Sequence, residues 1–269
     1  MPEAVPFIPD RQRLAIRTAY MSAPEHKALA ISILQASFVT DQKDDETAKA
    51  AALDACHRAT DPIVHGMPCD IYAVGDRVVY ARGHPPLPPE PWLVRDTSIE
   101  TPFAAESIPL ATDAVRANLL KFYRNGRTPK ALAISPQGMA GWFAAQGSQD
   151  EAVRRALEQC GGRAGVACAV VAVDDVFVVP IPATMKVVGL FRATGNAAIV
   201  PEARDDVAHR LRNAMSGWNA VAAGAGGRPG LMLRAGSEQQ AIDGALADCG
   251  RQDRACRVVA IGPFMVEPK

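Results

Sequence analysis

The hexapeptide KALAIS occupies residues 27–32 and recurs letter for letter at residues 130–135. A short run of small and aliphatic side chains is typical of a buried β-strand. The same order of features follows each copy along the chain, which indicates a repeated structural unit. A degenerate third copy, NAVAAG, stands at residues 219–224. We therefore expect three related units.

A capped helix is predicted downstream of each strand. Asp and Ser accept hydrogen bonds from the free amides at a helix start, and alanines four positions apart lie on one helix face. Ser148 with Glu151, and Ser237 with Gln240, also fit the reciprocal capping box. Each helix is thus expected to pack closely on a sheet. The three segments share the pattern A-x3-A-L-x2-C and are DDETAKAAALDAC at 44–56, SQDEAVRRALEQC at 148–160 and SEQQAIDGALADC at 237–249.

Hairpins are predicted on both sides of each capped helix. Runs of β-branched and aromatic residues after the helices are broken by two-residue turns at 75–76, 174–175 and 262–263. An amphipathic helix that follows a proline precedes each unit. The predicted fold class is α+β, with three tandem repeats of helix, β-hairpin, helix and β-hairpin. The repeats are placed at residues 6–84, 106–184 and 198–269.

Two stretches between the repeats are predicted to be linkers, at residues 85–105 and 185–197. The first contains PPLPPEPW at 85–92, whose prolines favour a stiff polyproline II spacer. Its P-x-x-P spacing is also compatible with a ligand for an aromatic groove. The second begins with an apolar run at 187–191, which either adds a strand or belongs to the linker.

All six cysteines belong to the repeats, two in each. One ends the capped helix and the other opens the next strand, and neither zinc-knuckle nor redox C-x-x-C spacing is present. The pattern favours one disulfide in each repeat, worth about 2–3 kcal/mol through loop closure in the unfolded chain. Reduced core thiols and metal binding are the alternatives. The expected pairs are Cys56 with Cys69, Cys160 with Cys168, and Cys249 with Cys256.

The charge balance and the cysteines restrict the classes of function and the cellular locations that we expect. The 29 basic and 29 acidic residues balance, which argues against nucleic-acid binding. No apolar run is long enough to predict membrane insertion. Disulfides would place the protein in an oxidising compartment, periplasmic or secreted, with its signal peptide absent from this chain. If the cysteines are reduced, the expected location is the cytoplasm.

The repeated pattern resembles a family of small exported bacterial domains of unknown function. These share an Ala/Ser strand, an Ala-rich helix that ends in Cys, and a strand that Cys opens. The stretch GWFAAQGSQDEAVRRALEQC at 141–160 carries the resemblance best, whereas the first copy lacks the Gly-Trp pair. The resemblance implies a fold and lends no catalytic residues. The label adenylate cyclase, which similar chains sometimes bear, lacks support because the paired metal-binding aspartates of that class are absent.

The sequence nominates no catalytic, cofactor-binding or metal-ligating residue. Ser32 and Ser135 lack the context of a nucleophile elbow and are expected to be structural. Four histidines fall in the first repeat, and a weak metal or pH-sensitive site is the alternative to surface or core positions. They are His26, His57, His65 and His84.

A binding function is the leading prediction. Trp92, Trp142 and Trp218 are candidates for a binding surface, although packing roles are the alternative. We expect a non-enzymatic exported module that binds an unknown protein or small molecule through a composite surface, without cofactors. The alternative is an enzyme of unknown reaction whose site lies between repeats.

Overall fold

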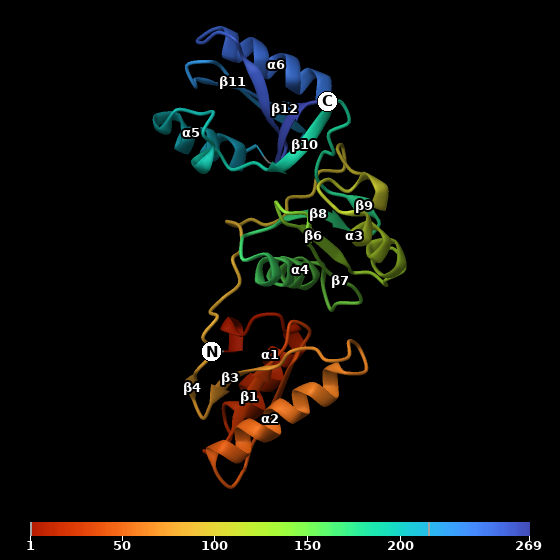
Figure 1. Cartoon of the computed structure of the whole chain (residues 1–269), viewed down its shortest axis with the longest axis vertical. Coiled ribbons are helices and arrows are strands. Elements are labelled where there is room, and N and C mark those ends of the chain that lie inside the picture. Colours follow the sequence, from red (N-terminus) through yellow and green to blue (C-terminus); the bar gives the residue numbers. More distant parts are fainter. Residues whose placement is uncertain (1, 215) are drawn as a thin grey trace.

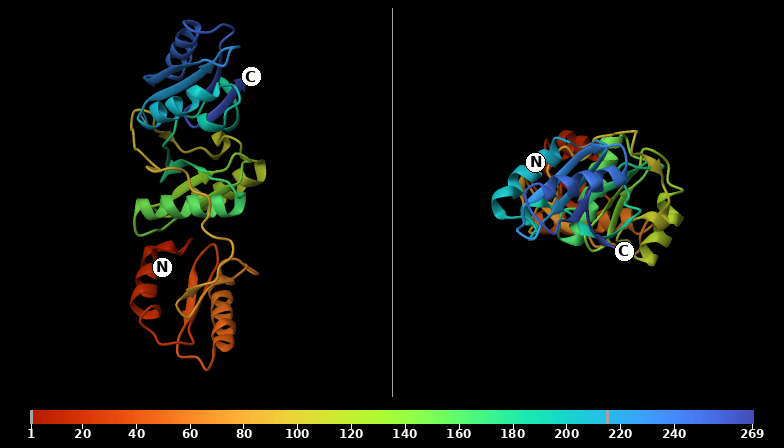
Figure 2. Two further views of the ribbon diagram at one scale, coloured as in Figure 1. Left: turned by 90° about the vertical axis from the view of Figure 1, so that its left-hand side faces the viewer. Right: turned by 90° about the horizontal axis from the view of Figure 1, so that it is seen from above.

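The computed structural model describes residues 2–214 and 216–269 and contains three antiparallel sheets, stacked along one axis (Figures 1 and 2). Helices pack against each sheet, which confirms the α+β class. We call the three bodies unit 1, unit 2 and unit 3; each contains one of the predicted repeats, and unit 1 also includes residues 2–5. The N-terminal end lies at the junction of units 1 and 2 (Figure 1).

The elements follow the same succession in each unit. Unit 1 comprises η1 (Pro2–Ala4), α1 (Asp10–Ala15), the π-helical turn η2 (Ile16–Tyr20), β1 (Ala28–Ile31), β2 (Ala36–Val39), α2 (Asp45–Thr60), β3 (Asp70–Val74) and β4 (Arg77–Val78). Unit 2 and the strand before it comprise β5 (Thr101–Pro102), η3 (Ala105–Ser107), α3 (Asp113–Asn118), the π-helical turn η4 (Leu119–Tyr123), β6 (Ala131–Ile134), β7 (Ala140–Phe143), α4 (Gln149–Ala164), β8 (Ala169–Val173) and β9 (Val176–Phe177). Unit 3 and the segment before it comprise β10 (Met185–Leu190), η5 (Ala193–Gly195), α5 (Pro201–Arg212), β11 (Trp218–Ala223), β12 (Pro229–Ala235), α6 (Glu238–Gly250), β13 (Arg257–Ile261) and β14 (Phe264–Pro268).

The three sheets share one strand order. Sheet 1 runs β2-β1-β3-β4, sheet 2 runs β7-β6-β8-β9-β5, and sheet 3 runs β12-β11-β13-β14-β10. The central strand pair of every sheet carries a register shift at a corresponding place, at Leu29/Ala30, Leu132/Ala133 and Val221/Ala222. The hairpin turns at 75–76, 174–175 and 262–263 are confirmed by pairing of the residues that flank them. The origin of the units by repetition stays a prediction.

The predicted helix caps are present. Asp44, Ser148 and Ser237 each accept a hydrogen bond from the backbone amide three positions on. The reciprocal bonds differ from the expected box, because Glu151 accepts from the amide of Gly147, one residue before the cap. Gln240 accepts from Gly236 in the same way. At α4 and α6 side chains thus satisfy two backbone amides around the helix start, whereas at α2 the Asp44 carboxylate satisfies one.

In units 2 and 3 the capped helix lies so close to the sheet that glycine is required on the neighbouring strand. A Cβ at Gly141 would lie 2.4 Å from the carbonyl oxygen of Ala156, and a Cβ at Gly230 would lie 2.0 Å from the amide nitrogen of Cys249. The disulfides fasten these helices to the following strands, and the three predicted pairs are confirmed. Their Cα–Cα distances are 6.2 Å for Cys56–Cys69 and 6.1 Å for each of the other two.

Both predicted linkers take part in the structure. The apolar run at 187–191 forms most of β10, which pairs with β14 and extends sheet 3. β5 pairs with β9 at the edge of sheet 2. The proline-rich stretch does not stand free, since Leu87, Trp92 and Leu93 pack against the core beside α4. The linkers thus contribute to units 2 and 3 instead of only separating them.

The lysine of KALAIS has a structural role in both copies. Lys130 is 1 % exposed, and its ammonium donates to the carbonyl oxygens of Arg124 and Gly126 at 3.0 Å and pairs with Asp175 at 2.8 Å. It also lies 5.2 Å from the centre of the Tyr123 ring. Lys27 makes the equivalent contacts with Ala23, Asp76 and Tyr20. Each lysine therefore joins the end of the π-helical turn to the hairpin turn.

We predict that Lys130→Met lowers the free energy of unfolding by about 2 kcal/mol, because two carbonyl groups lose a charged donor in a buried place. Asp175→Asn is the control and should cost under about 1 kcal/mol, since an exposed carboxylate contributes little. Urea unfolding followed by circular dichroism without reductant measures both. Equal small losses would contradict a structural role for the lysine.

Candidate functional site

The N-terminal segment of unit 1, residues 5–9, lies against α4 of unit 2. The amide of Phe7 donates to Glu158 Oε2 at 2.7 Å, and its carbonyl oxygen accepts from Arg155 Nε at 2.9 Å. The carbonyl oxygen of Ile8 accepts from Arg154 at 2.9 Å. These bonds satisfy backbone groups that the contact shields from water. We call this contact between unit 1 and α4 the seam.

A network of buried charges crosses the seam. Glu158 is 1 % exposed, and Nη1 of Arg154 donates to both of its carboxylate oxygens, at 2.9 and 3.0 Å. Arg13 of unit 1 approaches the same carboxylate at 3.5 Å, and Asp10 pairs with Arg154 at 2.9 Å. A carboxylate buried this deeply needs such partners, because its desolvation costs several kcal/mol.

Arg155 joins the two units at the same place. Its guanidinium donates to Leu34 O at 2.6 Å and to Gln146, and it lies 3.8 Å from the centre of the Phe143 ring. Burial lowers the pKa of Arg155 to about 10, with nearby Glu151 acting in the opposite direction. The side chain therefore remains charged at neutral pH and forms part of the wall of an adjoining groove.

The groove beside the seam has a volume of about 520 Å³ and is open to solvent. Unit 1 contributes α1, the turn at 34–35 and the loop after α2, while unit 2 contributes α3, η4, β7 and α4. Its apolar side chains are joined by arginines and carboxamides, and no Asp, Glu, His or Cys occurs among the described residues that line it. We call it the seam groove. Its lining includes Arg11, Leu34, Gln35, Ile63, Val64, Met67, Asn118, Phe122, Trp142, Phe143, Arg155, Gln159 and Arg163.

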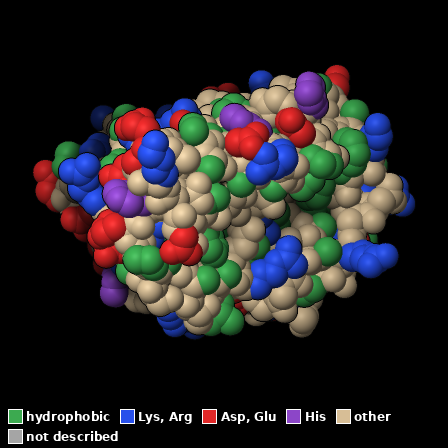
Figure 3. Space-filling model, turned by 90° about the horizontal axis from the view of Figure 1, so that it is seen from below, with side chains coloured by type: hydrophobic (Ala, Val, Ile, Leu, Met, Phe, Trp, Pro, Cys, Tyr) green, Lys and Arg blue, Asp and Glu red, His purple; other side chains and the backbone are tan. Residues whose placement is uncertain are grey.

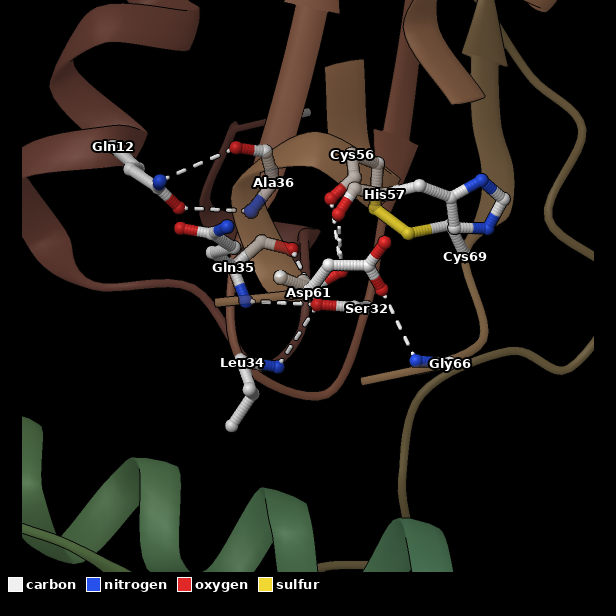
Figure 4. Close-up of a disulfide and its surroundings, with 11 residues drawn as sticks. Gln12, Ser32, Leu34, Gln35, Ala36, Cys56, His57, Asp61, Gly66 and Cys69 are labelled. Carbon is white, nitrogen blue, oxygen red and sulfur yellow. Dashed lines mark hydrogen bonds between the residues drawn. A yellow bond between two sulfur atoms is a disulfide. The ribbon is translucent and has the colours of Figure 1, made fainter. Parts of the chain in front are cut away.

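A disulfide-closed loop forms one wall of the seam groove. Cys56 and Cys69 are 13 positions apart, against 8 and 7 in units 2 and 3, so unit 1 has the longest loop. The loop presents Ile63, which is 63 % exposed, and Val64, which is 45 % exposed. Figure 4 shows the disulfide near the turn at 32–36, with Leu34 pointing toward α4. The disulfide thus limits the positions that this wall can take.

The seam groove differs in charge from the surface around it. Viewed from the unit 1 end, the surface carries acidic and basic side chains interspersed (Figure 3). Within the groove the ionisable groups are all arginines, of which Arg155 is held by unit 1. The arrangement can bind an apolar group next to an anion. It lacks a lining side chain suited to be a general base at neutral pH.

The three tryptophans do not share a surface. Trp142 lines the seam groove, where its backbone amide donates to Gln159 at 2.9 Å. Trp92 lines a different hollow of about 300 Å³ between units 2 and 3, and its indole donates to Pro88 O. Trp218 starts β11 and packs against the largest core cluster. Of the proposed anchors, the structure therefore places only Trp142 beside the seam.

The serines and histidines are dispersed. The Ser32 and Ser135 hydroxyls accept from backbone amides of the turns that follow them. His26 pairs with Asp45 at 2.8 Å and His65 lies 3.8 Å from Asp61, while His84 lines a second hollow of about 430 Å³. Within residues 2–214 and 216–269, no three His, Cys, Asp or Glu side chains gather as a metal site would require.

The seam residues belong to no motif that would predict a site from the sequence. Their signal lies in how the three copies differ, namely in the longer loop of unit 1 and in the middle of the capped helix. Only the helix of unit 2 carries two arginines and a glutamate at the positions that face the seam. These are Arg154, Arg155 and Glu158 in unit 2, against Ala50, Ala51 and Asp54 in unit 1, and Asp243, Gly244 and Ala247 in unit 3.

The chain matches no family model, and no curated protein or solved structure matches it either. The resemblance to exported bacterial domains therefore stays a prediction. In the part of the chain that the structure describes, no helix is both long enough and apolar enough to cross a membrane.

We predict that Gly161→Ala destabilises the protein by about 1–3 kcal/mol, the usual cost of overpacking. A Cβ there would lie 2.3 Å from the carbonyl oxygen of Pro86, a backbone atom of the linker that crosses α4. Gly250 occupies the corresponding position of α6 and has no neighbour within 4 Å of such a Cβ, so Gly250→Ala is the matched control. The control should leave the stability unchanged or raise it slightly, because Gly250 is the last residue of α6 and alanine stabilises a helix end less than its interior.

Thermal unfolding and the emission of Trp92 distinguish these outcomes. Gly161→Ala should also change the emission of Trp92, because the linker that carries it packs beside α4. Equal behaviour of the two variants would show that the linker does not depend on close contact with α4.

Proposed function

We propose that the protein is a non-enzymatic binding module and that the seam groove is its ligand-binding surface. One observation carries the proposal: large apolar side chains from both units remain exposed around one hollow. Ile63, Val64 and Phe122 are 63 %, 45 % and 45 % exposed, and Trp142 lies in the same lining. Exposed apolar groups of this size around a concave surface are typical of binding sites.

The lining favours binding over catalysis. An enzyme with a site between units would need a nucleophile, an acid or a base in that cleft. The seam groove offers guanidinium, carboxamide and aromatic groups instead. These groups are suited to hold a ligand by stacking, apolar contact and hydrogen bonding.

The three disulfides support an exported location, periplasmic or extracellular, as part of the same proposal. Non-reducing peptide mapping of protein recovered from its native compartment tests this point. We expect the three pairs to be oxidised. Six free thiols would overturn the export argument.

The groove can be tested with Nile red, a neutral apolar dye whose emission shifts when it leaves water. We expect saturable binding, and we expect Ile63→Asp to weaken it at least tenfold, because the variant removes apolar surface and adds a charge. Leu14→Asp is the matched control, since Leu14 is 59 % exposed but lies outside the groove lining. Equal dye binding by both variants and the unaltered protein would contradict the assignment.

A further inference from the structure

We infer that the ligand of the seam groove is an acidic peptide in an extended conformation, with apolar side chains between its carboxylates. The inference rests on the proposed function and names the class of ligand. Three features of the groove support it: the charge of the groove, the elements that supply its hydrogen-bond donors, and the position of its apolar side chains.

The ionisable side chains that line the groove are arginines, and two of them have no ion-pair partner among the described residues. Among the described residues, no hydrogen bond or ion pair engages the guanidinium groups of Arg11 and Arg163. Both residues are exposed, and partial desolvation lowers the pKa of Arg163. An incoming carboxylate would replace water at these guanidinium groups, and hydrogen bonds between two charged groups are the stronger kind. Complementary charge of this sort selects acidic ligands over basic ones.

The hydrogen-bond donors are distributed along the groove. Gln159 uses its carbonyl oxygen to accept from the Trp142 amide, which leaves its amino group for a ligand. Gln35 lines the groove from the turn between β1 and β2; its Nε2 is buried without an acceptor among the described residues, and it reaches a ligand only after the side chain rotates. Asn118 lines the groove from α3. Donors from three different elements suit the repeated carbonyl groups of a peptide, whereas a fatty acid carries all its acceptors at one end.

The apolar side chains supply anchors between the charges. Ile63 and Val64 come from the disulfide loop of unit 1, while Phe122 and Trp142 come from η4 and β7 of unit 2. Apolar groups on both walls allow one or two ligand side chains to be buried between the units. The lining thus combines basic and apolar side chains in one hollow, which suits a ligand that carries both carboxylates and apolar groups.

Two libraries of acetylated, amidated decapeptides provide the probe. Both have leucine or phenylalanine at every second position, and the remaining positions hold aspartate in one library and lysine in the other. We expect the unaltered protein to bind the aspartate library at least tenfold more tightly, measured by fluorescence anisotropy. Tryptophan emission should change on binding, and Trp142→Phe should remove most of that change because Trp142 lines the groove.

Charge reversal provides the decisive comparison. Arg163→Glu should weaken binding of the aspartate library about tenfold or more and improve binding of the lysine library. Arg210→Glu is the matched control, because Arg210 lies on α5, outside the groove, and should leave both affinities unchanged. Raising the salt concentration should weaken binding of the aspartate library by the unaltered protein.

The outcomes separate the inference from the proposed function. If Arg163→Glu leaves the preference unchanged while Ile63→Asp abolishes binding of Nile red, the groove binds ligands but acidic selection is wrong. If decanoate binds with the same dependence on Arg163 and neither peptide library binds, the ligand is an apolar small anion and the peptide inference fails. If Ile63→Asp changes no binding at all, the proposed function fails as well. If the unaltered protein self-associates and Ile63→Asp abolishes this self-association, the occupant of the groove is a second copy of the chain. This result would also overturn the inference.

Discussion

The close contact between each cysteine-ended helix and its sheet is the constraint on which the rest of the structure depends. At Gly141 and Gly230 no Cβ fits between strand and helix, so the helix face must also consist of small residues. The alanines of the A-x3-A-L-x2-C pattern meet this requirement, and the disulfide fastens the helix end to the next strand. The conserved letters of the three copies therefore belong to this contact.

Once one face of the helix is committed to the sheet, its other face is free to differ among the units. In α4 that face carries Arg154, Arg155 and Glu158, which bind the N-terminal segment and join unit 1 to unit 2. Gly161 and Gly162 leave room for Pro86 and for the ring of Phe7. The same helix thus supports its own sheet on one side and forms a junction on the other.

The seam groove arises because the two units meet along this junction without filling it. The longer disulfide loop of unit 1 overhangs one side, and η4 and β7 of unit 2 supply the other. Apolar groups stay exposed there because the contact between the two units does not extend over them. The proposed binding function therefore depends on features that distinguish the copies, whereas their common features maintain the fold.

Local patterns in the sequence determined the caps at Asp44, Ser148 and Ser237, the hairpin turns and the three cysteine pairs, because each depends on residues near one another in the chain. The place of β10 does not follow from the sequence, since an apolar run does not reveal which strand it will pair with. The proposed binding site follows from the sequence only in part: Trp142 is a recognisable candidate anchor, whereas no local pattern marks Ile63, Arg155 or Arg163. Only the tertiary structure decided which faces meet, because the bonds between Phe7 and α4 join residues about 150 positions apart and no local periodicity records such a contact.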